Sequence, residues 1–260
     1  MKTFGSLWKE RMKKGEFILG AHIFLPNTSV AEAMAFYGYE YIWVDGEHGL
    51  YDKEEIYNHI VAINGAGAGA IVRVVAGEPF FIKPVLEMGP DGIIFPMICN
   101  AEDAKRAINA CVYPPAGQRG YGPRRASRYG KINDREYLDS IDDCLVKIVQ
   151  IEHIDGVNNL DYILDVKGVD AVVVGPNDLA GSLGQLGTVK SPESLACCER
   201  IIACCKARNV PCGVSTGYGD SEYLKFWLDR GANFMFAGDD IGFIKSGAEA
   251  LIAKIKDMKK

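Results

Sequence analysis

The stretch LVKIVQIEHIDGVNNLDYILDVKGVDAVVVGPNDLAGSLG (145–184) contains two apolar runs of strand length, each followed by a polar turn and an amphipathic segment. The runs are LVKIVQIE (145–152) and DAVVVGP (170–176), and both are rich in β-branched residues. They are continuous rather than alternating, as expected for parallel strands that helices cover. This stretch therefore predicts strand–helix repeats around a parallel sheet.

The same pattern extends in both directions along the chain. Amphipathic segments separate the runs, and several begin at Ser, Asp or Asn and end at Gly, the residues expected at helix caps. Eight strands alternating with about eight helices in 260 residues predict an α/β fold, a closed (β/α)8 TIM barrel, with residues 1–260 as a single domain. An open doubly wound sheet stays an alternative, because periodicity alone does not show closure. The other strand-length runs are ILGAHIFL (18–25), YIWVDG (41–46), AIVRVV (70–75), GIIFPMI (92–98), CGVST (212–216) and NFMFAGD (233–239).

Composition and charge narrow the classes of protein. The formal net charge of −5 argues against a nucleic-acid partner, because phosphate binding needs a concentrated basic surface. No apolar run approaches the roughly 20 residues that span a bilayer, so we expect no membrane segment. The start, MKTFGSLWKERMKKGEF (1–17), lacks the apolar region of a secretory signal, and a cytoplasmic location is expected. The clustered Cys197, Cys198, Cys204 and Cys205 lack the spacing of a zinc or redox motif and are expected to be reduced thiols.

One long segment shows no helix or strand pattern: YPPAGQRGYGPRRASRYGKIND (113–134). Loops beyond about 15 residues in a compact domain are usually functional or disordered. We expect this loop to lie over the active face of the barrel or in a contact between subunits. Its arginines are expected to be solvated or in oligomer contacts, with binding of an acidic substrate or phosphate as the alternative; they are Arg119, Arg124, Arg125 and Arg128.

Charged and polar residues gather where the predicted strands end. In a (β/α)8 barrel the catalytic groups lie at the carboxyl ends of the strands, so these residues are expected to share one rim. Charges beside apolar strands are costly to bury unless they pair with one another or with an ion. The candidates are Asp45-Gly46-Glu47-His48 after the second strand, Arg73 in the third, Gln150-Ile151-Glu152 in the fifth, and Gly175-Pro176-Asn177-Asp178 after the sixth.

Glu152 and Asp178 are the predicted metal ligands. They come from consecutive strands, and a divalent cation between two carboxylates removes their repulsion. Hard oxygen ligands favour Mg²⁺ or Mn²⁺, with Co²⁺ or Zn²⁺ not excluded. The alternative is structural: one carboxylate pairs with Arg73 and the other caps the following helix.

Acid–base and substrate-binding roles are assigned in the same way. His48 and Asp45 lie three residues apart at a turn, and a carboxylate beside an imidazole gives a general base near neutral pH; the alternative is a loop histidine that faces solvent. Arg73 is expected to stabilise an enolate or oxyanion, with a structural salt bridge as the alternative. The turn from Gly175 through Pro176 and Asn177 to Asp178 leads from a strand into a helix, so its exposed N–H groups are candidates to hold a substrate carboxylate.

These motifs, in this order, resemble the HpcH/HpaI-type class II pyruvate aldolases, a family that includes 4-hydroxy-2-oxo-acid and 2-keto-3-deoxy sugar-acid aldolases and, more distantly, the citrate lyase beta subunit. The resemblance covers most of the chain. One departure is Gly49-Leu50-Tyr51 after His48, where well-known members have an Ala-Pro-Asn turn that shapes the aldehyde end of the pocket. The matching segments are WVDGEHG (43–49), IVRV (71–74), GIIFPMICNAEDAKRAI (92–108), YPPAGQRGYGPRRAS (113–127), VQIEHIDGVNNLDYIL (149–164) and VDAVVVGPNDLAGSLG (169–184).

The resemblance implies a set of roles for these residues. It implies a divalent ion on Glu152 and Asp178, an acid–base pair of His48 and Asp45, a catalytic Arg73, and Gln150 near the substrate. It also implies a homo-oligomer, a hexamer or trimer of dimers, in which the last helix, IGFIKSGAEALIAKIKDMKK (241–260), is exchanged between subunits.

The expected reaction is class II aldol cleavage. A 4-hydroxy-2-oxo acid is split into pyruvate and an aldehyde through a metal-stabilised enolate. No lysine is placed at the rim, since Lys147 precedes it, which argues against a Schiff-base route. The alternatives are a carbon–carbon lyase acting on a CoA thioester, as in the citrate lyase beta type, and a non-catalytic metabolite-binding barrel.

Overall fold

In the computed structural model, which describes residues 2–217 and 220–259, the strands close into a parallel barrel. Each strand pairs with the next along the chain, and β8 returns to β1, so the predicted (β/α)8 barrel is confirmed and the open sheet is excluded. The strands are β1 (Ile18–Ile23), β2 (Tyr41–Asp45), β3 (Gly69–Arg73), β4 (Gly92–Phe95), β5 (Val146–Ile151), β6 (Ala171–Val174), β7 (Cys212–Gly217) and β8 (Phe234–Asp239).

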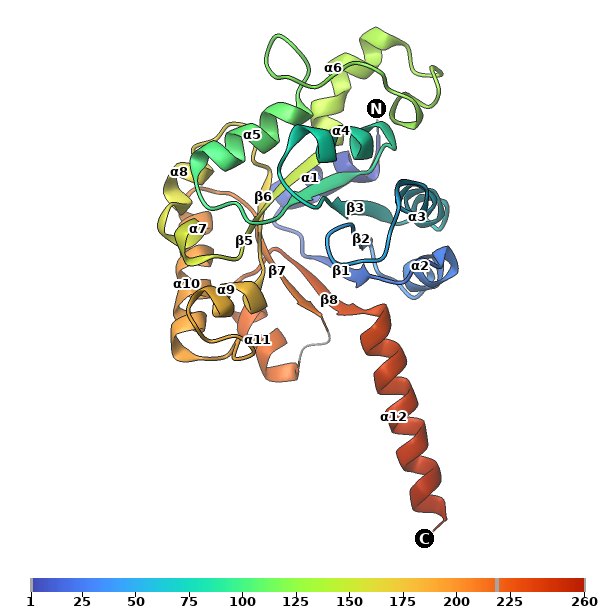
Figure 1. The fold of residues 1–260 in the computed structure, drawn as a ribbon, viewed down its shortest axis with the longest axis vertical. Helices are drawn as coiled ribbons and strands as arrows, with labels where there is room; N and C mark the ends of the chain where they lie inside the picture. Colours follow the sequence, from blue (N-terminus) through green and yellow to red (C-terminus); the bar gives the residue numbers. More distant parts are fainter. Residues whose placement is uncertain (1, 218–219, 260) are drawn as a thin grey trace.

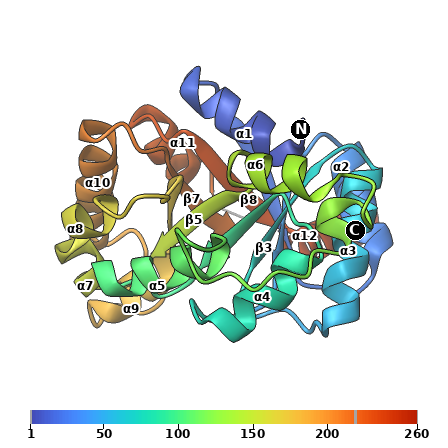
Figure 2. The ribbon, with the colours of Figure 1, turned by 90° about the horizontal axis from the view of Figure 1, so that it is seen from above.

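Helices connect the strands and cover the outside of the barrel (Figures 1 and 2). Most begin after an Asn, Asp, Ser or Thr whose side chain accepts a hydrogen bond from the first turn; α3, for example, has a capping box between Asp52 and Glu55. The helices are α1 (Phe4–Lys13), α2 (Thr28–Phe36), α3 (Lys53–Gly65), α4 (Pro79–Glu87), α5 (Ala101–Cys111), α6 (Asp134–Cys144), α7 (Ile154–Asn158), α8 (Leu160–Leu164), α9 (Pro176–Ser182), α10 (Pro192–Ala207), α11 (Ser221–Asp229) and α12 (Asp240–Met258), with a 3₁₀ turn, η1, at Arg125–Ser127.

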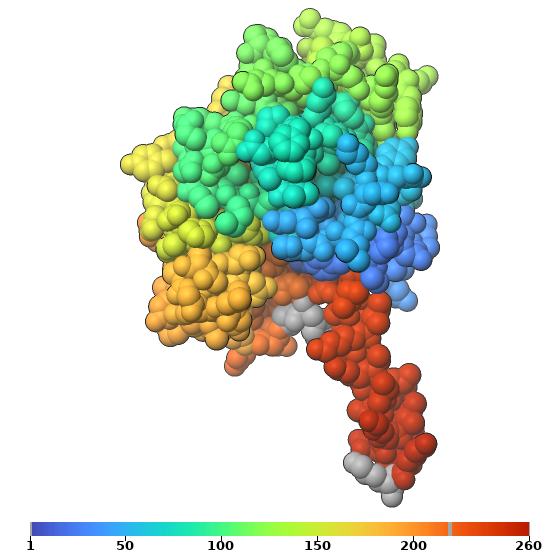
Figure 3. All heavy atoms as spheres, viewed as in Figure 1, coloured from blue at the N-terminus to red at the C-terminus, as the bar shows by residue number. Residues whose placement is uncertain are grey.

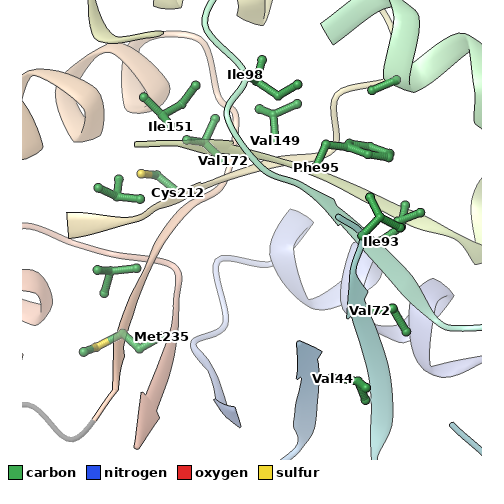
Figure 4. Close-up of a cluster of buried hydrophobic side chains, with 14 of the residues drawn as sticks. Val44, Val72, Ile93, Phe95, Ile98, Val149, Ile151, Val172, Cys212 and Met235 are labelled. Atoms are coloured by element: carbon green, nitrogen blue, oxygen red, sulfur yellow. The ribbon is translucent and has the colours of Figure 1, made fainter. Parts of the chain in front are cut away.

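The core has two layers, because alternate residues of each strand face opposite sides. One set packs between the barrel and its helices; Figure 4 shows Val44, Val72 and Val149 within it. The other set fills the barrel. Trp8 of α1 joins this inner set at the amino-terminal end of the strands, where its ring meets Tyr41 edge-on with centroids 4.8 Å apart. The inner set is Ile18, Tyr41, Trp43, Ile71, Ile94, Val146, Ile148, Ala171, Val173, Phe234 and Phe236.

The long 113–134 segment does not lie over the active face, so that part of its predicted placement is wrong. It follows a helix, α5, rather than a strand, and therefore lies at the amino-terminal end of the barrel, beside α6 and the amino terminus (Figure 1). Arg125 donates to the main-chain oxygen of Gly89 at 2.9 Å, just before β4. Arg119 is buried against Tyr137, whereas Arg124 and Arg128 are exposed, as expected of solvated arginines.

The last helix, α12, projects from the body of the molecule (Figures 1 and 3). Its final predicted residue, Lys260, lies outside the described residues. Within the described chain, no helix has the length and apolarity that a bilayer span needs. Large apolar side chains of α12 are nevertheless exposed: Ile241, Ile244, Leu251, Ile252, Ile255 and Met258.

Candidate active site

The apolar interior of the barrel gives way to polar side chains at the carboxyl ends of the strands. Strand alternation carries the inward-facing set from Trp43 to Asp45 in β2, and from Ile148 to Gln150 in β5. The same alternation applies around the ring. Polar side chains at the inward rim are His22, Asp45, Arg73, Gln150 and Ser215, with Glu152 directly after β5.

Asp45 and Arg73 form a buried ion pair at this rim. They are direct partners in the register of β2 and β3, and Arg73 Nε donates to Asp45 Oδ1 at 3.0 Å while Nη2 binds Oδ2. Arg73 Nη1 is also 2.9 Å from Glu47 Oε2 and 3.5 Å from Gln150 Oε1. The guanidinium lies 5.1 Å from the centre of the Trp43 ring. Two carboxylates therefore hold one buried cation in a defined orientation.

The turn after β2 is held by the same carboxylate. Asp45 Oδ1 accepts the main-chain N–H groups of Glu47 at 3.1 Å and His48 at 3.0 Å. In the described chain Asp45 thus contacts the main chain of His48 and not its imidazole, because Arg73 and the turn use the carboxylate oxygens. The His48 side chain is exposed at the rim. The predicted contact between the His48 imidazole and the Asp45 carboxylate is therefore not formed, and the two residues are joined through the main chain of the turn.

Glu152 is a buried carboxylate held by two amide groups. Oε1 accepts the main-chain N–H of Met97 at 2.8 Å, and Oε2 accepts Nε2 of Gln150. Met97 has φ 54°, an uncommon conformation for a residue with a side chain that costs roughly 1–3 kcal/mol. Burial raises the pKa of Glu152 to about 7, and the negative charges of Glu47 and Asp178 add to the rise.

Gly175 makes the space that Glu152 occupies. A Cβ atom on Gly175 would lie 2.6 Å from Glu152 Oε2 and 2.7 Å from Gln150 Nε2, closer than real Cβ contacts allow. The residue is the N-cap of α9, and Asp178 lies exposed in the first turn of that helix. The absence of a side chain at Gly175 thus lets the Glu152 carboxylate and the Gln150 amide pack against the start of α9.

The donor set of this region fits a hard divalent cation. Two carboxylates, on Glu152 and Asp178, interact repulsively, and a cation between them would remove the repulsion. Among the described residues no cluster of three or more His, Cys, Asp or Glu side chains meets metal-binding criteria. A pair of carboxylates leaves most coordination positions to water and substrate, which is usual for Mg²⁺ and for catalytic sites.

Comparisons with known proteins bear on this rim. Residues 19–245 match the model of the HpcH/HpaI aldolase/citrate lyase family. The chain belongs to that family. It is 34% identical over 251 residues to a hydroxypyruvate/pyruvate aldolase of Roseobacter denitrificans, covering 96% of both chains. It is also 34% identical to a 4-hydroxy-2-oxo-heptane-1,7-dioate aldolase of Salmonella paratyphi B, covering 97% of this chain and 95% of that one.

A solved structure agrees with these sequence relatives. An HpcH/HpaI aldolase/citrate lyase family protein from Burkholderia cenocepacia superposes with a TM-score of 0.91 at 29% identity, covering 96% of this chain and 99% of that one. Membership of the HpcH/HpaI family makes the chain a carbon–carbon lyase of the class II aldolase type, acting on small molecules. Class II aldolases depend on a divalent metal ion.

The structural alternative for Glu152 and Asp178 does not hold, whereas Arg73 does form the salt bridge given as its alternative and His48 does face solvent. Arg73 pairs with Asp45 and Glu47, whereas Glu152 is bound by amide groups. Asp178 does not cap α9 through its side chain, since the N-cap is Gly175. Both carboxylates predicted as metal ligands are therefore free of those structural roles.

Sequence reasoning assigned no role to three polar residues of the rim. Glu47 lies within the Asp-Gly-Glu-His string, and its contact with Arg73 needed the folded turn to be seen. His22 and Ser215 belong to apolar runs, and the signal for them was positional: each is two residues beyond an inward-facing glycine of the same strand, Gly20 or Gly213.

Proposed function

We propose that this enzyme cleaves 4-hydroxy-2-oxo acids into pyruvate and an aldehyde, and joins the two in the reverse direction. The observation that carries the proposal is Glu152, a buried carboxylate that Met97 and Gln150 hold in place and that interacts repulsively with Asp178. An ionised carboxylate in such a place needs a cation. The two family relatives named above act, by their names, on hydroxypyruvate or pyruvate and on a 4-hydroxy-2-oxo acid.

Glu152 and Asp178 would hold the divalent ion. Their all-oxygen donor set favours Mg²⁺ or Mn²⁺, and Co²⁺ or Zn²⁺ are compatible with it. When bound, the ion supplies Lewis acidity to the 2-oxo group of the substrate. Gln150 holds Glu152 by its amide, and so orients the carboxylate toward the substrate side.

Arg73 stabilises the negative charge that develops as the C3–C4 bond breaks. Its guanidinium is fixed by Asp45 and Glu47, so no reorientation is needed during the reaction. The first-turn N–H groups of α9, at Asn177 and Asp178, have no partner within the helix and are suited to a substrate carboxylate. Pro176, at the first position of α9, has no N–H and preorganises that turn.

His48 takes the proton of the C4 hydroxyl group. Its imidazole is exposed at the rim, and Asp45 positions it through the main chain of the turn. Loss of that proton turns C4 into the aldehyde carbon, and protonation of C3 completes pyruvate. A lysine Schiff base is not required. Lys147 lies at the amino-terminal end of β5, with its Nζ 3.7 Å from Asp142.

We also propose that the protein is a homo-oligomer built through α12, a hexamer or a trimer of dimers. Ile241, Ile244, Ala248, Leu251 and Ile255 follow one another at spacings of three and four residues, and they form an exposed apolar stripe on a helix that leaves the barrel. A stripe of this kind needs a partner surface.

Exchange of the pyruvate methyl protons with deuterium tests the aldolase proposal, because it reports enolate formation without an aldehyde. We expect exchange with Mg²⁺ or Mn²⁺ and none after chelation. Glu152→Ala and Asp178→Ala should abolish it. Asp155→Ala, which removes an exposed carboxylate close to Glu152 in the chain, is the matched control and should retain exchange. Exchange that survives chelation or either ligand substitution would refute the metal role.

A further inference from the structure

A hydrogen-bonded polar pair, His22 and Ser215, lies on the other side of the rim. His22 is on β1 and Ser215 is on β7, and both strands neighbour β8. The groups proposed for the pyruvate half belong to β2, β3, β5 and the start of α9. Because the strands form a closed ring, the arc β7–β8–β1 adjoins β2, whose following turn is expected to shape the aldehyde end of the pocket, and this arc is therefore available to the aldehyde half of the substrate.

The partners of His22 define which nitrogen carries the proton. Nδ1 is 3.2 Å from the main-chain oxygen of Gly238, and Nε2 is 2.8 Å from Ser215 Oγ. A carbonyl oxygen only accepts hydrogen bonds, so Nδ1 donates and Nε2 accepts from the Ser215 hydroxyl. The ring is buried, with 3% exposure, and packs 4.9 Å from the Trp43 ring centre.

This arrangement makes Ser215 an acceptor toward the site. Its single proton is directed at His22 Nε2, and only lone pairs remain for other partners. Ser215 itself is half-buried, whereas His22 below it is closed off from solvent. A substrate group that meets Ser215 must therefore be a hydrogen-bond donor.

The negative charge on this arc also disfavours an aldehyde that carries a carboxylate. Asp239, at the end of β8, pairs in register with His22 and lies 3.4 Å from where a Cβ of Gly217 would be. Its Oδ1 caps α12 through Gly242 N at 2.7 Å. A carboxylate on the aldehyde would meet the lone pairs of Ser215 and the negative charge of Asp239. A neutral group with a hydroxyl proton meets neither penalty.

We propose that Ser215 selects a neutral 2-hydroxyaldehyde by accepting a hydrogen bond from its hydroxyl group, and that His22 is the positioning residue that makes Ser215 an acceptor. This rests on the proposed pyruvate aldolase function and names its aldehyde class. An aldehyde without the hydroxyl leaves the lone pairs of Ser215 unmatched. An aldehyde that carries a carboxylate is disfavoured on charge.

The test compares substrates that differ by one hydroxyl group. Cleavage of 4,5-dihydroxy-2-oxopentanoate and of 4-hydroxy-2-oxopentanoate is followed as pyruvate release, with 4-hydroxy-2-oxoheptanedioate as the anionic comparison. We expect kcat/KM for the dihydroxy acid to exceed both others by about 10-fold or more. Ser215→Ala should bring the ratio of the two pentanoates toward 1. Thr216→Val, which removes the neighbouring hydroxyl that bonds Gly217 O, should keep the wild-type ratio.

Two substitutions of His22 separate positioning from packing. His22→Gln retains an acceptor near Nε2 and should keep the selectivity, whereas His22→Leu frees the Ser215 proton and should lose it. Any one of three results would overturn the proposal. They are a ratio near 1 in the wild-type enzyme, equal ratios in Ser215→Ala and Thr216→Val, and full selectivity in His22→Leu. Pyruvate proton exchange in the wild type distinguishes the failures: exchange without selectivity refutes only the role of this pair, and no exchange refutes the aldolase proposal and this inference with it.

Discussion

Asp45 and Arg73 stand opposite each other in the register of β2 and β3, and their side chains close a buried ion pair at the carboxyl end of the barrel. The pair belongs to both the fold and the proposed site, because Arg73 is proposed to stabilise the enolate while Asp45 also holds the turn that carries His48. Removing one partner leaves a buried charge without compensation.

Asp45→Asn should therefore lower the free energy of unfolding by about 3 kcal/mol. Glu47→Gln is the matched control: Glu47 contacts the same guanidinium but is more exposed, and its loss should cost below about 1 kcal/mol. Urea unfolding of the three proteins measures the difference. Equal losses of unfolding free energy in both variants would contradict a larger contribution of Asp45 than of Glu47 to stability.

Divalent metal should stabilise the protein more at pH 8 than at pH 5.5. Without metal, the pKa of Glu152 is raised to about 7 in the folded state, above its ordinary value near 4.5. The folded state then binds more protons between these values, so the contribution of Glu152 to stability is full below about pH 4.5 and is lost as pH rises through 7. Metal binding replaces the proton, and its effect grows over the same range.

Thermal unfolding with and without Mg²⁺ or Mn²⁺ across this pH range measures that effect. Glu152→Gln should raise metal-free stability at pH 8 and remove most of the response to metal. A metal response that is independent of pH between 5.5 and 8 would contradict the assignment of Glu152.

Gly175→Ala should weaken metal binding by about 10-fold or more, equivalent to about 1.4 kcal/mol, while the barrel stays folded. The added Cβ would lie 2.6 Å from Glu152 Oε2 and must displace that carboxylate. Gly181→Ala in the same helix is the control, since its Cβ would meet only the Leu186 side chain at 3.1 Å. Calorimetric titration with Mn²⁺ compares the two, and equal affinities would show that Glu152 does not need this space.

Acid should destabilise the protein partly through His22. Burial lowers the pKa of His22 to about 4, below its ordinary 6.5. The folded state thus binds fewer protons than the unfolded chain in this interval, and the stability that the neutral ring contributes is lost as pH falls from 6.5 toward 4. His22→Gln lacks the titrating imidazole, so its unfolding free energy should depend less steeply on pH. An unchanged slope would contradict a neutral His22.

Leu251→Glu in the apolar stripe of α12 should reduce the size of the assembly. Ala253→Glu adds the same charge on the opposite face of the helix and should leave the assembly intact. Sedimentation velocity measures the mass of the assembly that each variant forms. If both variants keep the wild-type mass, the stripe is not a subunit contact.

Much of the fold could be predicted from local patterns. Continuous β-branched runs such as AVVV at 171–174 form strands because both faces of a parallel strand are covered, and the capping residues mark where helices begin. The position of the 113–134 segment could not be predicted from such local patterns. Its composition indicates a long loop, but its place at the amino-terminal end of the barrel depends on its following a helix, α5, rather than a strand.

For the site, the sequence alone determined which polar residues follow which strands, since Asp45, Arg73, Glu152 and Asp178 interrupt or end apolar runs. It did not determine their partners. Asp45 was expected to hold the His48 imidazole, and the register of β2 and β3 instead placed it against Arg73. Only closure of the barrel brought His22 of β1 to Ser215 of β7, because hydrogen bonds between side chains 193 residues apart in the chain depend on distances that no local pattern encodes.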